Sequence, residues 1–191
     1  MADAEDLVHG IDFDSPQVRL IGELNDASAV KFIETLAAIG EDPAPLVIEV
    51  TTTGGDAELG RRLALDIERA RKRSGRRMVF VGKSVCYSAG VTIMSAFPVR
   101  DRFVTRECWL LLHRRQLDKT VKLSGPLHES LPLVEALAAE IRVGTQLETE
   151  GFERLIAGSD IGMDEILEKT PHNWYLSAEE ALKRGLVAAI I

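Results

Sequence analysis

Short apolar stretches alternate with helical patterns along most of the chain, and this alternation limits the possible folds more than any other feature. The predicted strands cover residues 18–20, 46–50, 78–81, 103–104, 109–112 and 186–191. Apolar residues at helical spacing predict helices over residues 26–39, 56–73, 90–96, 163–167 and 177–184. Asp26 or Ser28 is the expected cap of the first helix. Alternating elements of these lengths are typical of an α/β domain with a largely parallel sheet.

The size and composition fit one compact domain. The chain has 191 residues, of which 46% are hydrophobic and 28% charged. We expect residues 1–16 to form an acidic N-terminal tail or a loosely docked segment and residues 17–191 to form the domain. A net charge of -7 disfavours nucleic acid as a partner, because that binding depends on Lys and Arg neutralising phosphates.

The sequence favours a cytoplasmic protein. Cys86 and Cys108 are too few for a disulfide scaffold, and no basic leader followed by an apolar stretch opens the chain. The longest apolar stretches are interrupted by polar residues and are shorter than the ~20 residues that cross a bilayer. We therefore expect no membrane span, and we also expect neither a cofactor nor a metal.

The stretch from residue 127 to about 150 departs from the alternation. It contains one continuous helical pattern with Pro132 near its beginning. The apolar positions of this pattern are Leu131, Leu133, Val134, Leu137, Ile141 and Leu147. A long helix this late in a small domain is expected to project from it.

Three features that follow predicted strands carry possible chemistry. Ser88 lies where a strand turns into a helix, His113 ends another strand, and Gly54 and Gly55 form a turn after a third. A serine hydroxyl becomes a nucleophile when a base accepts its proton, and the oxyanion that forms needs fixed N–H donors. Each feature alone more often has a structural role, but together and in this order they indicate a serine hydrolase.

The whole pattern resembles the proteolytic subunit of Clp protease, a family of the Clp protease/crotonase-like superfamily. Residues 51–56, Thr-Thr-Thr-Gly-Gly-Asp, resemble the family's Asn-Ser-Pro-Gly-Gly turn, and residues 85–90 resemble its nucleophile run. Residues 111–114, Leu-Leu-His-Arg, resemble its Met-Ile-His-Gln, and the spacing of 113 − 88 = 25 residues also matches. Residues 176–187 are similar to its final helix and strand, so the likeness runs from about residue 18 to the end.

The resemblance implies a single-domain α/β fold of repeated β-β-α and βαβ units, with a protruding handle helix over about 127–150. It implies a serine endopeptidase in which Ser88 is the nucleophile and His113 the general base. The backbone N–H groups of Gly55 and Ala89 would form the oxyanion hole, and the Gly54–Gly55 segment would bind an extended peptide or unfolded-protein substrate. It further implies a homo-oligomer of stacked rings around a proteolytic chamber.

Two residues depart from the family pattern. Asn173 occupies the position of the third catalytic residue, which is an Asp four residues before the serine that here is Ser177. An Asn oxygen can orient the imidazole of His113 but carries no charge to stabilise imidazolium, so we expect a slow or conditional enzyme. Glu49 lies in a strand whose family counterpart carries aromatic residues for docking an ATP-dependent unfoldase, and this charge disfavours that partner.

Two other functions remain open at this point. Asn173 and Glu49 favour a catalytically impaired ring subunit that assembles with, or regulates, another subunit. A crotonase-like acyl-CoA enzyme would hold a thioester oxygen with two backbone N–H groups and would need no Ser-His pair. It would need acidic catalysts and an adenine-nucleotide site, for which the sequence offers no convincing residues.

Overall fold

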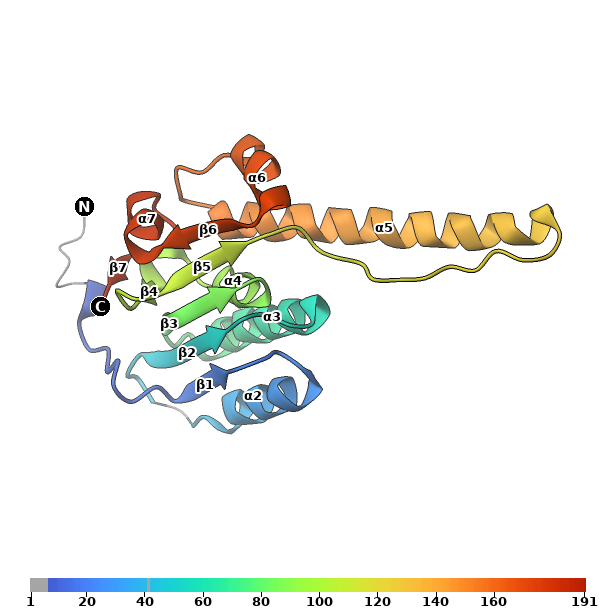
Figure 1. The fold of residues 1–191 in the computed structure, drawn as a ribbon. Helices are drawn as coiled ribbons and strands as arrows, with labels where there is room; N and C mark the ends of the chain where they lie inside the picture. The colour runs from blue at the N-terminus through green and yellow to red at the C-terminus, as the bar shows by residue number, and fades with distance from the viewer. Residues whose placement is uncertain (1–6, 41) are drawn as a thin grey trace.

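The computed structural model describes residues 7–40 and 42–191 of the chain. Its strands are β1 (Val18–Ile21), β2 (Leu46–Thr52), β3 (Met78–Tyr87), β4 (Arg102–Val104), β5 (Trp109–Leu112), β6 (Trp174–Ser177) and β7 (Ala189–Ile190). Its helices are α2 (Asp26–Ala38), α3 (Ala57–Ser74), α4 (Ala89–Met94), α5 (Leu127–Ile156), α6 (Met163–Lys169) and α7 (Ala178–Lys183), with short 3-10 helices at Val99–Asp101 and Thr170–His172. The predicted α/β class is confirmed (Figure 1).

The sheet branches at β3. Strands β1, β2, β3, β4 and β7 lie side by side in that order and run parallel. The first half of β3 pairs with β4, and its second half pairs with β5, which in turn pairs antiparallel with β6. A register shift against β2 accompanies this change, and Ser84 lies there with a φ of 63°. The branch brings the carboxyl ends of β2, β3 and β5 to the same edge, where α/β sheets place their sites.

Several predicted boundaries were wrong. Strand β3 extends to Tyr87 instead of ending near residue 81, and β7 is only two residues long. Strand β6 was not predicted. The side chain of Asn25, not of Asp26 or Ser28, caps α2 by accepting a hydrogen bond from the Ser28 N–H at 3.1 Å.

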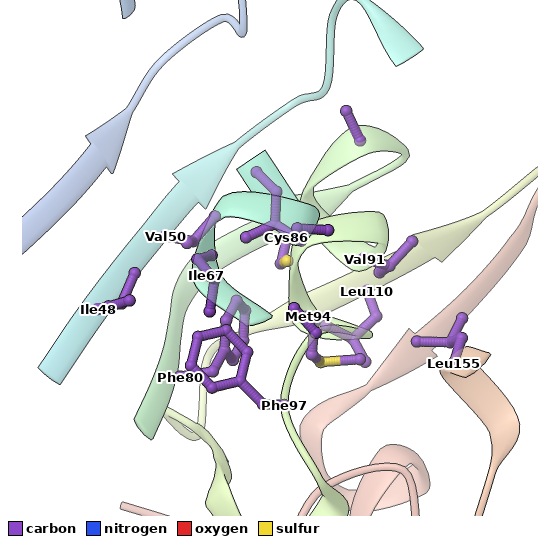
Figure 2. Packing of buried hydrophobic residues seen from close by; sticks show 14 of the residues in the cluster. Ile48, Val50, Ile67, Phe80, Cys86, Val91, Met94, Phe97, Leu110 and Leu155 are labelled. Atoms are coloured by element: carbon purple, nitrogen blue, oxygen red, sulfur yellow. The ribbon is translucent and has the colours of Figure 1, made fainter. Parts of the chain in front are cut away.

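The main core lies between the sheet and helices α2, α3 and α4. Ile48, Val50 and Phe80 of the strands pack against apolar side chains such as Ile67 of α3 and Met94 of α4 (Figure 2). All five side chains are fully or almost fully buried. This packing fixes the strand ends that carry the candidate site.

The opposite face of the sheet is covered by part of the predicted tail. Val8, Ile11 and Phe13 pack over a second apolar cluster, formed by Val47, Val79, Val81 and Phe103. The Phe13 ring meets the Phe103 ring edge-on, with centroids 5.1 Å apart. Residues 1–6 of the predicted tail lie outside the described residues.

Glu49 lies on β2, where its side chain is buried. Its side chain pairs with Lys83 at 2.8 Å and lies 3.8 Å from Arg19. The charge that the sequence places in β2 is therefore neutralised within the chain. None of the described helices is both long and apolar enough to span a membrane.

Helix α5 projects from the body as the predicted handle (Figure 1). It has 30 residues, which corresponds to about 45 Å at ~1.5 Å per residue, and it continues past the predicted end to Ile156. The buried Arg102 side chain fixes its base by donating to the carbonyls of Leu155 at 2.7 Å and Phe97 at 2.8 Å. Large apolar side chains remain exposed along its outer part, namely Leu127, Leu131, Leu133, Val134, Ile141 and Val143.

Candidate active site

Ser88 sits at a sharp turn between β3 and α4. Its φ of 53° and ψ of -111° are unfavourable for a residue with a side chain. Its N–H donates to the carbonyl of Leu111 on β5 at 2.9 Å, which ties the turn to the neighbouring strand. The fold therefore holds a serine hydroxyl in a strained, half-buried position at the N-terminus of a helix.

Gly54 packs directly against this serine. A Cβ on Gly54 would lie 2.9 Å from the Ser88 Cβ, and its φ is +108°. The Gly54 N–H donates to the Thr52 hydroxyl at 3.0 Å, and its carbonyl accepts from the Leu24 N–H at 2.8 Å. Because both main-chain groups of Gly54 are used inside the chain, this residue shapes the site instead of offering hydrogen bonds to a substrate.

Gly55 presents a free backbone N–H. It forms a parallel bridge with Leu24, in which the Leu24 N–H donates to the Gly54 carbonyl and the Asp56 N–H donates to the Leu24 carbonyl. In such a bridge the N–H of the central residue points to the other side. The described hydrogen bonds give the Gly55 N–H no acceptor.

Ala89 supplies a second N–H that has no acceptor among the described residues. It is the first residue of α4, where backbone N–H groups have no partner within the helix. Gly55, Ala89 and Ser88 line one cavity of about 730 Å³. Two unpaired N–H donors thus lie beside a serine hydroxyl, as an oxyanion hole requires.

His113 lines the same cavity, directly after β5. Its Nδ1 lies 2.6 Å from the carbonyl oxygen of Arg114. A carbonyl can only accept, so Nδ1 carries the proton of this hydrogen bond and Nε2 of the neutral ring is left as an acceptor. This is the tautomer that a general base needs. In the described part of the chain, no hydrogen bond joins His113 to Ser88.

Asn173 directly precedes β6, the strand that pairs with β5. The last pair of the antiparallel β5–β6 register is Leu112 with Trp174, so His113 directly follows one strand and Asn173 directly precedes the other at the same end. Asn173 is exposed, has a φ of 58°, and does not line the cavity. The described hydrogen bonds do not join its side chain to His113. The structure brings four of the predicted site residues together at the cavity and leaves Asn173 beside them.

A network of charges anchors the segment that carries Asn173. Arg184 donates two hydrogen bonds to Glu165 at 2.9 and 2.6 Å, and Lys169 donates a third at 2.5 Å. The Lys169 ammonium also lies 4.3 Å from the centre of the Trp174 ring. The hydrogen bonds from Arg184 and then Lys169 lower the pKa of Glu165 to about 2 from its ordinary 4.5.

This network predicts an acid-dependent loss of stability. A carboxylate with a lowered folded-state pKa stabilises the fold above pH 4.5, and this contribution is lost as the pH falls toward 2. Glu165→Gln should lower the free energy of unfolding by about 1–2 kcal/mol at pH 7, a value reduced for partial exposure. Urea denaturation of both proteins should show this difference shrinking between pH 4.5 and pH 2.

The exposed Glu168 on the same helix is the matched control, and Glu168→Gln should change the unfolding free energy little at any pH. A Glu165→Gln difference that stayed constant down to pH 2 would contradict this account.

Neither cysteine is an alternative nucleophile. Cys86 and Cys108 are both fully buried. Burial raises the pKa of the Cys86 thiol well above its ordinary value, and it raises that of Cys108 to about 12. The described residues also contain no group of three or more side chains that could hold a metal ion.

Charged residues of the cavity were missed at the sequence level. Arg61 and Glu58 on α3, Arg115 after β5 and Glu148 on α5 all line it. Only Arg61 could have been inferred from the sequence. It lies four residues after Ala57, which also lines the cavity, so the two residues share one face of the helix. The rest come from distant parts of the sequence and meet only in the fold.

Comparison with known proteins supports the fold. No protein-family model matches the chain, and no curated protein matches it. Among solved structures, an Asn-to-Asp mutant of ClpP1 from Listeria monocytogenes is similar, with a TM-score of 0.69 and 22% sequence identity. The alignment covers 91% of this chain and 90% of that chain. The molecule is thus a single-sheet α/β protein with a projecting helix, and its fold is that of the Clp protease proteolytic subunit.

Proposed function

We propose that the chain is a serine peptidase of the Clp type. Ser88 is the nucleophile, His113 is the general base, and the N–H groups of Gly55 and Ala89 form the oxyanion hole. The observation that carries this proposal is the meeting of these groups at one cavity, with two unpaired N–H donors beside a strained serine. A strained backbone at Ser88 costs stability, and a purely structural serine would give no reason to retain that cost.

In the proposed mechanism, the Ser88 oxygen attacks the carbonyl carbon of a bound peptide while Nε2 of His113 takes its proton. The carbonyl oxygen becomes an oxyanion that accepts from Gly55 and Ala89. His113 then returns the proton to the leaving amine, and an acyl-enzyme remains. Water attacks this ester with His113 again as base, which releases the second product and restores Ser88.

The partners of His113 explain why the proposed enzyme would be slow. The Arg114 carbonyl fixes the tautomer of the ring, and this is one of the two tasks of the third catalytic residue. The other task is to stabilise imidazolium with a negative charge. Neither a carbonyl nor the neutral Asn173 side chain carries one, so the imidazolium that forms during acylation is poorly stabilised.

Assembly into rings belongs to the same proposal. The exposed apolar side chains of α5 would be covered by the helices of further copies, as in stacked rings around a chamber with peptide or unfolded-protein substrates. An unfoldase is disfavoured. The face of β2 that carries Glu49 is occupied by an internal ion pair and, at Val47, by the packed N-terminal segment.

A catalytically impaired ring subunit is the second candidate. It is favoured by the absence, among the described residues, of a hydrogen bond from Ser88 or Asn173 to His113. Such hydrogen bonds are often loose before substrate binds and tighten in the complex, so the two functions are distinguished by the reactivity of Ser88.

Covalent labelling with a fluorophosphonate tests the proposal. We expect stoichiometric labelling of the wild-type chain and its complete loss in Ser88→Ala. Ser84→Ala is the matched control, since Ser84 is an exposed serine of β3, four residues before Ser88, that also has a positive φ and lies outside the cavity. A wild-type chain that stays unlabelled at every pH would overturn the peptidase proposal. Labelling without peptide turnover would favour the impaired subunit.

A further inference from the structure

The wall of the cavity beside the nucleophile is strongly charged. Four carboxylates and three guanidinium groups line it, namely Asp56, Glu58, Glu140, Glu148, Arg61, Arg115 and Arg154. A peptide bound for attack by Ser88 must place a side chain near these groups. Their hydrogen bonds therefore determine which side chain the cavity accepts.

Every one of the carboxylates already has a donor. Asp56 accepts from the N–H groups of Glu58 and Leu59 at 2.7 and 2.9 Å. Glu58 accepts from the Arg115 guanidinium, and Glu148 accepts from the Arg115 N–H. Glu140 accepts from Lys119. A basic substrate side chain would therefore compete with donors that the chain already supplies.

Arg61 is different because its donors are not used. In the described part of the chain its guanidinium makes no hydrogen bond, and its nearest carboxylate is Glu58 at 3.7 Å. Its Nε is buried and has no partner. A buried donor that lacks an acceptor costs free energy, and a bound anionic group would remove this cost. The other two arginines of the cavity donate to Glu58 and to the Glu150 carbonyl.

The position of Arg61 places it close to the chemistry. It follows Gly60, where a Cβ would lie only 3.0 Å from the Cβ of Ala89. This close approach packs the start of α3 against the start of α4, whose first N–H belongs to the proposed oxyanion hole. Arg62, the next residue, does not line the cavity and is paired with Asp66 at 2.7 Å.

We infer that this cavity selects peptides with an acidic side chain next to the cleaved bond, and that Arg61 binds the carboxylate. The inference rests on the proposed function, because Ser88 defines the cleaved bond. Apolar residues of the same cavity, such as Leu147 and Phe152, can contact the aliphatic part of a glutamate. Arg61 is thus a specificity residue, distinct from the groups that perform the reaction.

Hydrolysis of matched peptides tests this specificity. The peptides differ only in Glu, Gln or Lys on the amino side of the cleaved bond. We expect the wild-type chain to show a kcat/KM about tenfold or more higher for Glu than for Gln, since hydrogen bonds to charged groups are the strong ones. Arg61→Gln should remove this preference, and Arg61→Glu should favour Lys. Arg62→Gln should leave the wild-type preference unchanged.

Binding separates this inference from the proposed function, because it needs no reaction. Fluorescence anisotropy with Ser88→Ala should give a Kd about tenfold lower for the Glu peptide than for the Gln peptide. The difference should vanish when Arg61→Gln is added, and it should persist in part with Arg61→Lys, which guards against a folding defect in the first variant. Equal binding of the two peptides, or a preference that survives Arg61→Gln, would overturn the inference even if Ser88 proves to be a nucleophile. A clear Glu preference without any hydrolysis would retain the inference and reject the peptidase.

Discussion

Replacing Asn173 by aspartate is expected to raise the kcat/KM for peptide hydrolysis about a hundredfold or more. The reverse change in a serine protease with a complete triad costs roughly 10⁴ in turnover. The β5–β6 register ends with the pair Leu112 and Trp174, so residue 173 and His113 come next at the same end of the two strands. A carboxylate there would stabilise the imidazolium that forms when Ser88 is acylated.

The same substitution should change the pH dependence. A neighbouring negative charge raises the pKa of an imidazole because it favours the charged form. The acidic limb of the kcat/KM profile, which reports the base of the free enzyme, should therefore move to higher pH in Asn173→Asp. This shift is a direct readout of contact between residue 173 and His113, since a remote stabilising effect would leave the limb in place.

A matched control is available one residue earlier. His172 is exposed and ends the 3-10 helix before β6, so His172→Asp adds a carboxylate to the same segment at a different position. It should leave turnover near the wild-type value. Unchanged or lower turnover in Asn173→Asp would show that the Arg114 carbonyl, and not residue 173, is the effective partner of the ring.

Much of the fold could be predicted from periodicity and a few motifs. The long helix was visible because its apolar positions recur over several turns, and β2 because six of its seven residues are apolar or β-branched. Strand β6 was not visible, since only Leu176 of its four residues is buried and the strand pairs along one edge alone. The strand predicted over residues 78–81 and the one expected to end at Ser88 are one strand, which was not evident because Lys83 and Ser84 interrupt its apolar pattern at the register shift.

Part of the candidate site could also be predicted from the sequence, and part could not. Ser88, Gly55 and His113 could be proposed because each stands at a strand end within a short recognisable run. The charged wall of the cavity could not, because it is formed by residues that are far apart in the chain. Glu58 and Arg115 are in contact across 57 residues, and Arg115 and Glu148 across 33. The free donors of Arg61 became evident only when these contacts were known.

Gly55→Ala is expected to lower the free energy of unfolding by about 3–5 kcal/mol, the sum of a steric and a conformational cost. A Cβ at this position would lie 2.1 Å from the carbonyl oxygen of Leu24 and 2.9 Å from its backbone nitrogen. These are backbone atoms of the bridge between the two segments, and they cannot rotate away as a side chain would. The φ of +140° adds strain for any residue other than glycine.

Two other glycines separate these costs. Gly22 has a φ of +92° with open space around its Cβ position, so Gly22→Ala should cost only the strain, about 1 kcal/mol. Gly40 has open space and no positive φ, and Gly40→Ala should change stability little. Urea denaturation followed by circular dichroism measures all three. If Gly55→Ala lowered the free energy of unfolding no more than Gly22→Ala does, the Leu24 backbone would have to move away from the added Cβ. The Gly55 N–H would then not be the fixed donor that the proposed oxyanion hole requires, and fluorophosphonate labelling of Ser88 should survive the substitution.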